Sequence, residues 1–360
     1  MKQFAKHNRV MFVNSIGIRF PSLTDQAFFY RLFNKIKSLT RWAKWAQTNL
    51  LILSPIIIPL YKYVSIKYIN RYLLLLQLKI AMKFFHFQEP ILYIVLPTAV
   101  EIMGRLHEKL TIYHCVDKFE AYNGVPDSVR EMEKRLIKNA DLVFYPNRKL
   151  FEERCELNPR SFHVAHAVDY HHFSLAMSEQ TAISEDIQKI KSPIIGYFGA
   201  IEYFIDQELL TYLAKQEPHW SFVLIGRVNV EMNLLIKFKN VHFLGKRNYN
   251  VLPKYAKAFD VCIIPWITNH DFDFHRSPIK LREYLSTGKP IVSVSFPEVH
   301  FFKDVVYIAQ DKFEFHQYLR MAIHEKDEFK RMQRLNKVRN TSWKRKAEEI
   351  SSLIIDALEH

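Results

Sequence analysis

The chain of 360 residues contains only three cysteines, Cys115, Cys155 and Cys262, and none of them belongs to a CxxC motif. This scarcity excludes a disulfide framework and a thiol-rich metal centre, and it favours a reducing compartment. The first residues, MKQFAKHNRVMFVNS, lack the apolar region and cleavage site of a signal peptide. The longest apolar run, NLLILSPIIIPLY, contains two prolines and is too short to span a bilayer. We therefore expect neither a signal peptide nor a membrane-spanning helix.

Acidic residues are nearly absent from the beginning of the chain. Residues 1–85 contain 14 Lys and Arg against the single Asp25, a net charge of +13, whereas residues 176–360 contain 26 against 23. Between positions 28 and 44, large apolar side chains fall near helical spacing with basic residues between them, and residues 61–85 repeat this mixture. Such a mixture is typical of helices on an anionic membrane surface, although a solvated basic face is the alternative. We find no signature of nucleic-acid binding and expect no nucleic acid as a partner.

Glycine is also scarce, with eight residues, and five of them follow or precede strands in the second half. Short apolar runs bounded by Gly, Pro, Asn or Asp alternate with helical patterns, which predicts parallel sheets covered on both faces. Six runs lie in each half: 9–14, 49–55, 91–97, 110–117, 141–147 and 161–169, then 193–199, 221–226, 241–245, 261–266, 290–296 and 305–309.

These patterns predict an α/β fold with two Rossmann-like, doubly wound domains. We place the first domain at 1–175 and the second at 176–340, with a polar linker within 174–192. Apolar residues at helical spacing from Trp343 to Leu358 predict an amphipathic helix, and we expect residues 341–360 to return to the first domain.

The segment HRSPIKLREYLSTGKPIV, residues 275–292, carries the strongest chemical signal. A polar, basic turn leads into a short helix with Lys280 and Glu283, and Gly288 ends that helix before the next strand. A helix N-terminus and a lysine can hold an anion, and a carboxylate can accept hydrogen bonds from a diol. The segment therefore predicts a site for a ligand with both phosphate and hydroxyl groups, such as a nucleotide sugar.

The second half resembles the nucleotide-sugar domain of GT-B glycosyltransferases, in the broad bacterial group 1 family that builds surface polysaccharides. The resemblance is carried by IIGYFGAIEYFIDQELL, WSFVLIGRV, NVHFLGKRNYNVLPKYAKAFDVCIIPW and SPIKLREYLSTGKPIVSV. The first half matches more loosely, through RVMFVNS, LTIYHCVDKFEAY, ADLVFYPNRKL and HVAHAVDYHHF. The resemblance implies a GT-B fold, in which two Rossmann-like domains face a cleft.

The family pattern also implies a donor site. Glu283 would bind the ribose or a donor-sugar hydroxyl, and Lys280 would neutralise the diphosphate. The remaining donor-binding candidates are Ser277 and the amides near Ile279 for phosphate oxygens, Gly199 for close backbone approach, and Arg227, Lys246, His275 and Arg276 along the base or diphosphate side.

Two departures from the family leave the stereochemistry open. His275 stands eight residues before Glu283, where retaining members commonly have an acidic residue. The first glycine loop carries Glu202 and Asp206 instead of the Arg and Lys of those members, so Arg276, Lys280 and Arg227 would supply the phosphate charge. The chain also resembles inverting xanthan-type glucuronosyltransferases, which share the Ser-x-x-Lys arrangement and use an Asp of the first domain as base.

Inverting transfer needs a general base near the acceptor hydroxyl. Asp117 ends the strand LTIYHCVD and is expected at the carboxyl edge of its sheet, with His114 and Glu120 as neighbours that could share the role. Asp117 could equally cap the following helix, or only position the acceptor if the reaction retains configuration.

We therefore expect a glycosyltransferase on the cytoplasmic face of the membrane, using a UDP- or GDP-sugar donor and a glycan or polyprenyl-diphosphate-linked acceptor. We expect no metal or other cofactor, because no histidine cluster or DxD motif fits a metal site of this fold. A nucleotide-sugar 2-epimerase and a non-catalytic nucleotide-sugar-binding homologue in an assembly complex are the alternatives. The basic segment argues against the epimerase, and the retained SPIKLREYL argues against the non-catalytic homologue.

Overall fold

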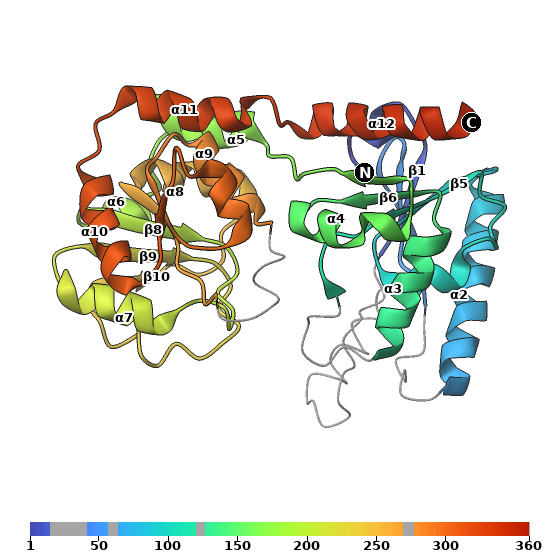
Figure 1. Cartoon of the computed structure of the whole chain (residues 1–360), viewed down its shortest axis with the longest axis horizontal. Helices are drawn as coiled ribbons and strands as arrows, with labels where there is room; N and C mark the ends of the chain where they lie inside the picture. The colour runs from blue at the N-terminus through green and yellow to red at the C-terminus, as the bar shows by residue number, and fades with distance from the viewer. Residues whose placement is uncertain (15–41, 57–63, 120–126, 269–276, 360) are drawn as a thin grey trace. The chain divides into compact units, whose positions relative to one another are not determined.

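The computed structural model of the chain describes residues 1–14, 42–56, 64–119, 127–268 and 277–359. The chain divides into two compact units (Figure 1). Unit 1 comprises Met1–Val164 together with Ala347–His360, and unit 2 comprises Ala165–Lys346. The polar stretch 174–192, predicted as a linker, lies within the range of unit 2 and includes the short helix α6 (Glu185–Gln188).

Unit 2 is built on one parallel sheet of six strands, and each corresponds to one of the six runs predicted in the second half. The strands are β8 (Ile194–Phe198), β9 (Ser221–Ile225), β10 (Val241–Phe243), β11 (Val261–Ile264), β12 (Ile291–Val294) and β13 (Tyr307–Ala309). Their order is β10-β9-β8-β11-β12-β13, so the chain moves outward from β8 in both directions. A doubly wound sheet binds its ligands at such a switch point, outside the carboxyl ends of the strands.

The helices of unit 2 lie between some of its strands along the chain and also before and after the sheet. They are α5 (Tyr170–Ser174), α7 (Gln207–Gln216), α8 (Leu252–Ala258), α9 (Ile279–Ser286), α10 (Lys312–Ile323) and α11 (Glu328–Arg339). The central strands are buried along their whole length, and their side chains form one continuous core with the inner faces of α7, α8, α9 and α10. Burial on both faces explains why these strands are continuous apolar runs in the sequence.

Unit 1 differs from the predicted six-stranded sheet, because its described strands form two separate sheets. The first has the order β1-β3-β2, with β1 (Val10–Val13), β3 (Leu50–Leu53) and β2 (Ala43–Gln47). The second is parallel, in the order β4 (Ile91–Ile94), β5 (Leu110–His114), β6 (Leu142–Tyr145) and β7 (Ser161–His163).

Strand β2 corrects one prediction. The spacing predicts a helix as far as residue 44, but residues 43–47 pair antiparallel with β3, with Ala43 opposite Leu53 and Trp45 opposite Leu51. The two strands form a hairpin joined by residues 48–49, and its cross-strand hydrogen bonds outweigh the helical spacing. The rest of the predicted amphipathic segment, residues 28–41, lies outside the described residues.

The helices of unit 1 are α2 (Val64–Phe84), α3 (Asp127–Asn139), α4 (Arg148–Arg154) and most of α12 (Trp343–Glu359), which is the predicted C-terminal helix. Ile350 of α12 is buried in the cluster that contains Leu110 and Ile112 of β5 and Phe144 of β6. Among the described residues, no helix is both long and apolar enough to cross a bilayer.

Candidate functional site

Three glycines mark the turns after neighbouring strands of unit 2: Gly199 after β8, Gly226 after β9 and Gly245 after β10. The N–H of Gly199 donates to the Ile225 carbonyl at 2.9 Å, and that of Gly226 donates to the Gly245 carbonyl at 3.0 Å. A Cβ on Gly226 would lie 1.8 Å from the carbonyl oxygen of Gly199, so only glycine fits there. Gly199 itself has a φ of +143°, which also favours glycine. The three turns therefore lie in close contact at the carboxyl edge of the sheet.

Lys280 lies on the first turn of α9 and extends to the turn after β8. Its ammonium donates to the Tyr197 hydroxyl, and Nζ lies 4.0 Å from the centroid of the Tyr197 ring and 5.0 Å from that of Trp266. A Cβ on Gly199 would come within 2.5 Å of Nζ, so the absence of a side chain there leaves room for the ammonium. Two residues that the sequence assigns to phosphate binding, Gly199 and Lys280, are thus neighbours. Cation–π contacts of this kind orient the lysine.

The N-terminus of α9 lies next to this lysine. Ile279 is the first residue of the helix, and no side chain of the described residues caps this end. The first-turn amides therefore retain the positive end of the helix dipole, as the sequence suggests for the amides near Ile279. Ser277, a predicted phosphate ligand, donates its hydroxyl proton to Glu298 Oε1, with Oγ at 3.2 Å. In this arrangement Ser277 has no hydroxyl proton left to donate to a phosphate.

Glu283 follows one turn after Lys280 and is half-buried. Burial raises the pKa of its carboxyl to about 7, and the nearby Lys280 opposes that rise. Burial, together with the charges of Glu283 and Asp169, also raises the pKa of Tyr249. The Tyr249 ring stacks on His172 with centroids 4.7 Å apart. His172 and Tyr249 therefore form an aromatic surface in the same unit as Glu283.

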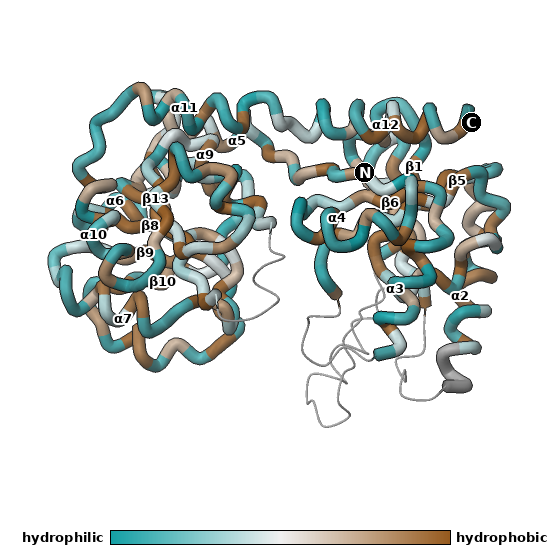
Figure 2. Tube along the Cα trace, in the orientation of Figure 1, coloured by the Kyte–Doolittle hydropathy of each residue, from teal (hydrophilic) through white to brown (hydrophobic). Residues whose placement is uncertain are grey.

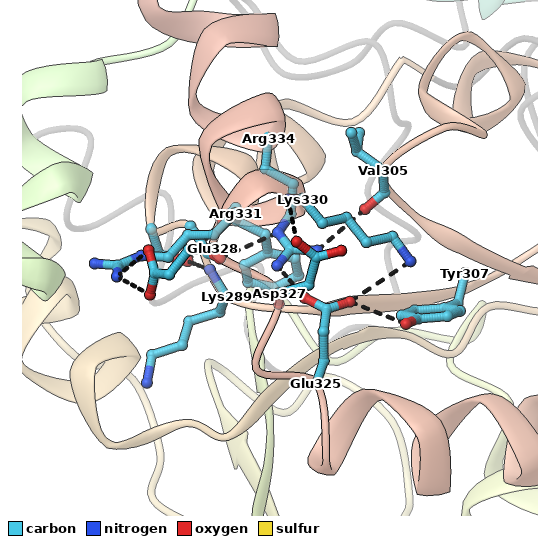
Figure 3. A network of polar contacts seen from close by, with 12 residues as sticks. Lys289, Val305, Tyr307, Glu325, Asp327, Glu328, Lys330, Arg331 and Arg334 are labelled. Atoms are coloured by element: carbon cyan, nitrogen blue, oxygen red, sulfur yellow. Dashed lines mark hydrogen bonds and ion pairs between the residues drawn. The ribbon is translucent and has the colours of Figure 1, made fainter.

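Buried ion pairs hold α9 at both ends. Near its start, Arg282 Nη2 lies 2.5 Å from Glu298 Oε1, and both side chains are less than 10% exposed. At its end, Arg334 of α11 donates from Nε to the Gly288 carbonyl at 3.1 Å and pairs with Glu325 (Figure 3). These contacts fix the helix that carries Lys280 and Glu283.

The network around Glu325 extends further. Figure 3 shows its carboxylate between Arg334, Lys330 and Tyr307, and the Tyr307 hydroxyl donates to Oε2 at 2.9 Å. Arg334 is 1% exposed, so its charge has no access to solvent and depends on Glu325 and on backbone carbonyls.

Arg227 and Lys246, the other basic candidates of unit 2, are both exposed at strand-end turns. The backbone of Arg227 pairs with the first glycine loop, because its carbonyl accepts from Ile201 N–H at 2.9 Å. Arg247, which follows Lys246, forms an ion pair with Asp186 at 2.7 Å, and its Nε donates to the Tyr255 hydroxyl.

Both acidic residues of the first glycine loop have structural partners. Glu202 Oε1 accepts from Asn229 Nδ2 at 2.5 Å. Asp206 Oδ1 accepts from Leu209 N–H at 2.8 Å and caps α7. Their presence in place of basic residues is therefore compatible with ordinary roles in the fold.

The acid–base candidates belong to unit 1. His114 is the last residue of β5, and its Nδ1 hydrogen-bonds the Tyr93 hydroxyl at 2.8 Å. Asp117 follows the carboxyl end of β5 and is half-buried, with its carbonyl accepting from Phe119 N–H at 3.1 Å. Glu120 and, in unit 2, His275 and Arg276 lie outside the described residues, as does the helix that Asp117 was expected to cap.

Several residues that position Lys280 and helix α9 were not predicted from the sequence. Tyr197 and Trp266 contact the Lys280 ammonium, and Glu298 and Arg334 anchor α9. The charge of Glu283 contributes to the raised pKa of Tyr249. Tyr197 lies two residues before Gly199 and Trp266 lies two residues after the end of β11, so both occupy the strand ends where a ligand site is expected. No group of three or more possible metal ligands occurs within the described ranges.

A doubly wound unit with glycine turns, a lysine and a glutamate on one helix, preceded by a second α/β unit, defines the GT-B class of fold. Residues 193–317 match the family model described as "Glycosyl transferases group 1". A curated relative, the Bacillus subtilis protein TuaH, named for teichuronic acid biosynthesis, is 24% identical over 203 residues. That match spans 52% of this chain and 50% of TuaH, so the chain covers about half the length of this relative.

Solved structures share the fold over nearly the whole chain. Sucrose-phosphate synthase from Thermosynechococcus elongatus superposes with a TM-score of 0.68 at 12% identity, covering 96% of this chain and 98% of that one. HepE of Anabaena, solved with UDP and glucose, gives a TM-score of 0.65 at 13% identity, covering 97% and 99%. TarM of Staphylococcus aureus, solved with UDP and sugars, gives 0.58 at 13% identity, covering 81% and 59%. At these identities the likeness establishes the fold alone.

Proposed function

We propose that this protein is a glycosyltransferase that moves a sugar from a UDP- or GDP-sugar to a glycan or a polyprenyl-diphosphate-linked acceptor in surface polysaccharide synthesis. The observation that carries the proposal is the placement of the Lys280 ammonium over the Gly199 turn, with Glu283 one helical turn further on. Departure of a nucleoside diphosphate leaves negative charge on the phosphates, and a fixed cation beside helix-terminal amides stabilises that charge.

The roles of the donor side follow from this geometry. Lys280 and the first amides of α9 would hold the diphosphate, and the carboxylate of Glu283 would accept from a ribose or sugar hydroxyl. Arg227 and Lys246 would remain available from the neighbouring turns. The positive charge on the diphosphate would come from the protein itself, so we propose that no metal cofactor takes part.

The relatives support UDP as the first donor nucleotide to test. HepE and TarM were solved with UDP, and the name of TuaH refers to a wall polysaccharide. For the acceptor side we propose Asp117 as general base, with His114 and Glu120 as supporting groups. A lipid-linked acceptor would bring the protein to the cytoplasmic face of a membrane, and the net charge of +13 in residues 1–85 supports peripheral association there.

A thermal-shift series tests the donor site. UDP, GDP and their sugars at millimolar concentration are added to the wild type, to Lys280→Met, and to Lys237→Met, an exposed lysine of the same unit as control. A nucleotide at 100 times its Kd stabilises the folded state by about 2.7 kcal/mol, which raises the melting temperature measurably. We expect the full shift in the wild type and in Lys237→Met, and a shift of about half that size or less in Lys280→Met. A protein that no nucleotide stabilises has no donor site of this kind.

NMR of the products then separates the alternatives. Transfer requires an acceptor and yields a glycoside of defined anomeric configuration. An epimerised sugar formed without acceptor identifies an epimerase instead, and nucleotide binding with no product under either condition identifies a non-catalytic homologue.

A further inference from the structure

Helix α2 of unit 1 has an inverted distribution of polar and apolar side chains. Leu75, Leu78 and Ala81 on its inner side join the core cluster with Leu53. The polar residue Gln77 is buried with them, and its amide exchanges hydrogen bonds with both backbone groups of Ile56 at 2.8 Å. The solvent side, by contrast, carries six large apolar side chains that are 48–72% exposed: Tyr68, Ile69, Tyr72, Leu76, Ile80 and Phe84.

Apart from the adjacent Tyr68 and Ile69, these exposed positions recur every three to four residues, so they lie on one face of the helix. Figure 2 shows hydrophobic and hydrophilic residues alternating along α2. At 1.5 Å per residue, the face extends about 24 Å from Tyr68 to Phe84. A helix on the surface of a globular protein normally turns charged and polar residues to water. The only charged residues among the exposed positions of this face are Lys79 and Lys83, and α2 contains no acidic residue.

A shallow groove of about 460 Å³ borders the same face. Its walls combine apolar groups of α2 with the cations Lys79 and Arg105, and the full lining is Tyr72, Leu75, Leu76, Lys79, Gly104, Arg105 and His107. The nearby carboxylate of Glu108 is engaged within the loop, because it accepts from the N–H groups of Gly104 and Leu106. Arg105 and Lys79 therefore keep their positive charge toward the groove.

We propose that this face of α2, with Lys79, Lys83 and Arg105, lies on the surface of an anionic phospholipid bilayer. The exposed apolar side chains enter the boundary between headgroups and acyl chains, and the groove between Lys79 and Arg105 receives a headgroup phosphate. The helix lies on the membrane and does not cross it, consistent with its hydropathy. This inference rests on the peripheral association proposed above and assigns it to one element.

Charge distinguishes the membrane from a second copy of the chain. An isologous contact between two α2 faces would bring Lys79 and Lys83 of both copies into one interface, and α2 supplies no acidic residue to pair with them. An anionic bilayer instead complements the excess of basic residues throughout residues 1–85, where Asp25 is the only acidic residue.

Vesicle flotation tests the inference. The full chain is mixed with vesicles of phosphatidylcholine, or of phosphatidylcholine with phosphatidylglycerol, at low and high salt. Leu76→Ser/Ile80→Ser/Phe84→Ser removes exposed apolar groups, and Lys79→Gln/Lys83→Gln removes charge. The matched controls in unit 2 are Ile236→Ser/Phe329→Ser, at positions 65% and 72% exposed, and Lys237→Gln/Lys239→Gln.

We expect the wild type and both controls to float with the anionic vesicles at low salt. The apolar variant should partition about tenfold more weakly or worse at either salt concentration. The charge variant should lose about fivefold per lysine at low salt and little at high salt. Stabilisation by UDP, measured in parallel, should be unchanged in all variants and shows that each one folds.

Each other outcome has a definite meaning. A wild type that does not float with anionic vesicles at low salt overturns both the peripheral association and the role of α2. A wild type that floats while the α2 variants float equally well overturns the role of α2 alone. An oligomer of the wild type that the apolar variant dissociates, seen by light scattering, shows that the face joins copies of the chain.

Discussion

Both units bury arginine–glutamate pairs, but these pairs support different parts of the molecule. In unit 1, Arg154 Nη1 lies 3.1 Å from Glu133 Oε2. Glu133 also accepts hydrogen bonds from the Tyr113 hydroxyl at 2.7 Å and from Cys115 Sγ at 3.4 Å. Cys115 Sγ lies 3.5 Å from the Asp117 carbonyl oxygen, to which it can also donate. The pair in unit 1 therefore supports the end of a strand.

In unit 2 the pairs act directly on α9, the helix that carries Lys280 and Glu283. Arg282 lies on α9 itself, and Arg334 binds the carbonyl of Gly288 at its end. A buried ion pair adds little net stability over an apolar substitute, but its geometry is directional and its loss leaves an unpaired charge. The comparison teaches that the proposed donor-side groups are held through the helix that carries them, whereas the pair in unit 1 is linked to the proposed base through Cys115 Sγ and the Asp117 carbonyl.

We expect the largest effect on activity from Asp117→Asn, a substitution in unit 1. If unit 1 supplies the general base, kcat should fall by about 10²–10⁴ while the affinity for UDP, measured by calorimetry, stays within about twofold of the wild type. The amide keeps the shape of the side chain but cannot take a proton at neutral pH. A kcat near that of the wild type would assign the base elsewhere or indicate a retaining reaction.

Removal of one anchor of α9 should cost nearly as much. Arg334→Leu leaves Glu325 buried without its main partner, so the free energy of unfolding in urea should fall by about 3–5 kcal/mol. The double variant Arg334→Leu/Glu325→Leu should recover most of this loss, because no buried charge remains. Equal losses in the single and double variants would show that packing, and not the charge pair, determines stability here.

Lys280→Met should weaken UDP binding by roughly 10–100-fold, the cost of one charge-assisted hydrogen bond to phosphate. Tyr197→Phe keeps the ring under the ammonium and removes only the hydroxyl, so we expect a loss of about fivefold or less. Titration calorimetry with UDP measures both. A larger loss in Tyr197→Phe than in Lys280→Met would mean that Tyr197, and not Lys280, contacts the nucleotide.

The smallest expected effect is the pH dependence of donor binding through Glu283, whose pKa is about 7 in place of 4.5. The carboxylate that accepts from a hydroxyl is populated above this pKa, so affinity for a UDP-sugar should rise about tenfold from about pH 6 to about pH 8. The protein without ligand should lose stability as pH rises from about 4.5 to 7, because only the unfolded chain releases this proton in that window. Glu283→Gln should remove both dependences, and a profile unchanged in that variant would assign the titration to another group.

The sequence was sufficient for most of the fold, because all twelve predicted strands occur, each within its apolar run. Strand β2 was missed because its partner β3 decides its conformation, and the split of unit 1 into two sheets depends on pairing that no local pattern encodes. The rule that ligands bind at the carboxyl ends of parallel strands correctly brought Gly199 and Lys280 together.

The missed site residues have a common physical cause. Glu298 is 21 residues from Ser277, and Arg334 is 46 residues from Gly288, so their contacts depend on how separate elements pack. Tyr197 and Trp266 are apolar in pattern and would be assigned to the core, where both in fact lie. Only the position of the lysine reveals that their ring faces also orient a charge.

Helix α12 determines the order in which the molecule can be completed during synthesis. It begins at Trp343, in the range of unit 2, but from Ala347 onward it belongs to unit 1, where Ile350 is buried against β5. Residues 1–164 of unit 1 are therefore synthesised first, yet Ile350 can join their core only after unit 2 has been synthesised. The cluster of Leu110 and Ile112 lacks this side chain throughout the synthesis of unit 2.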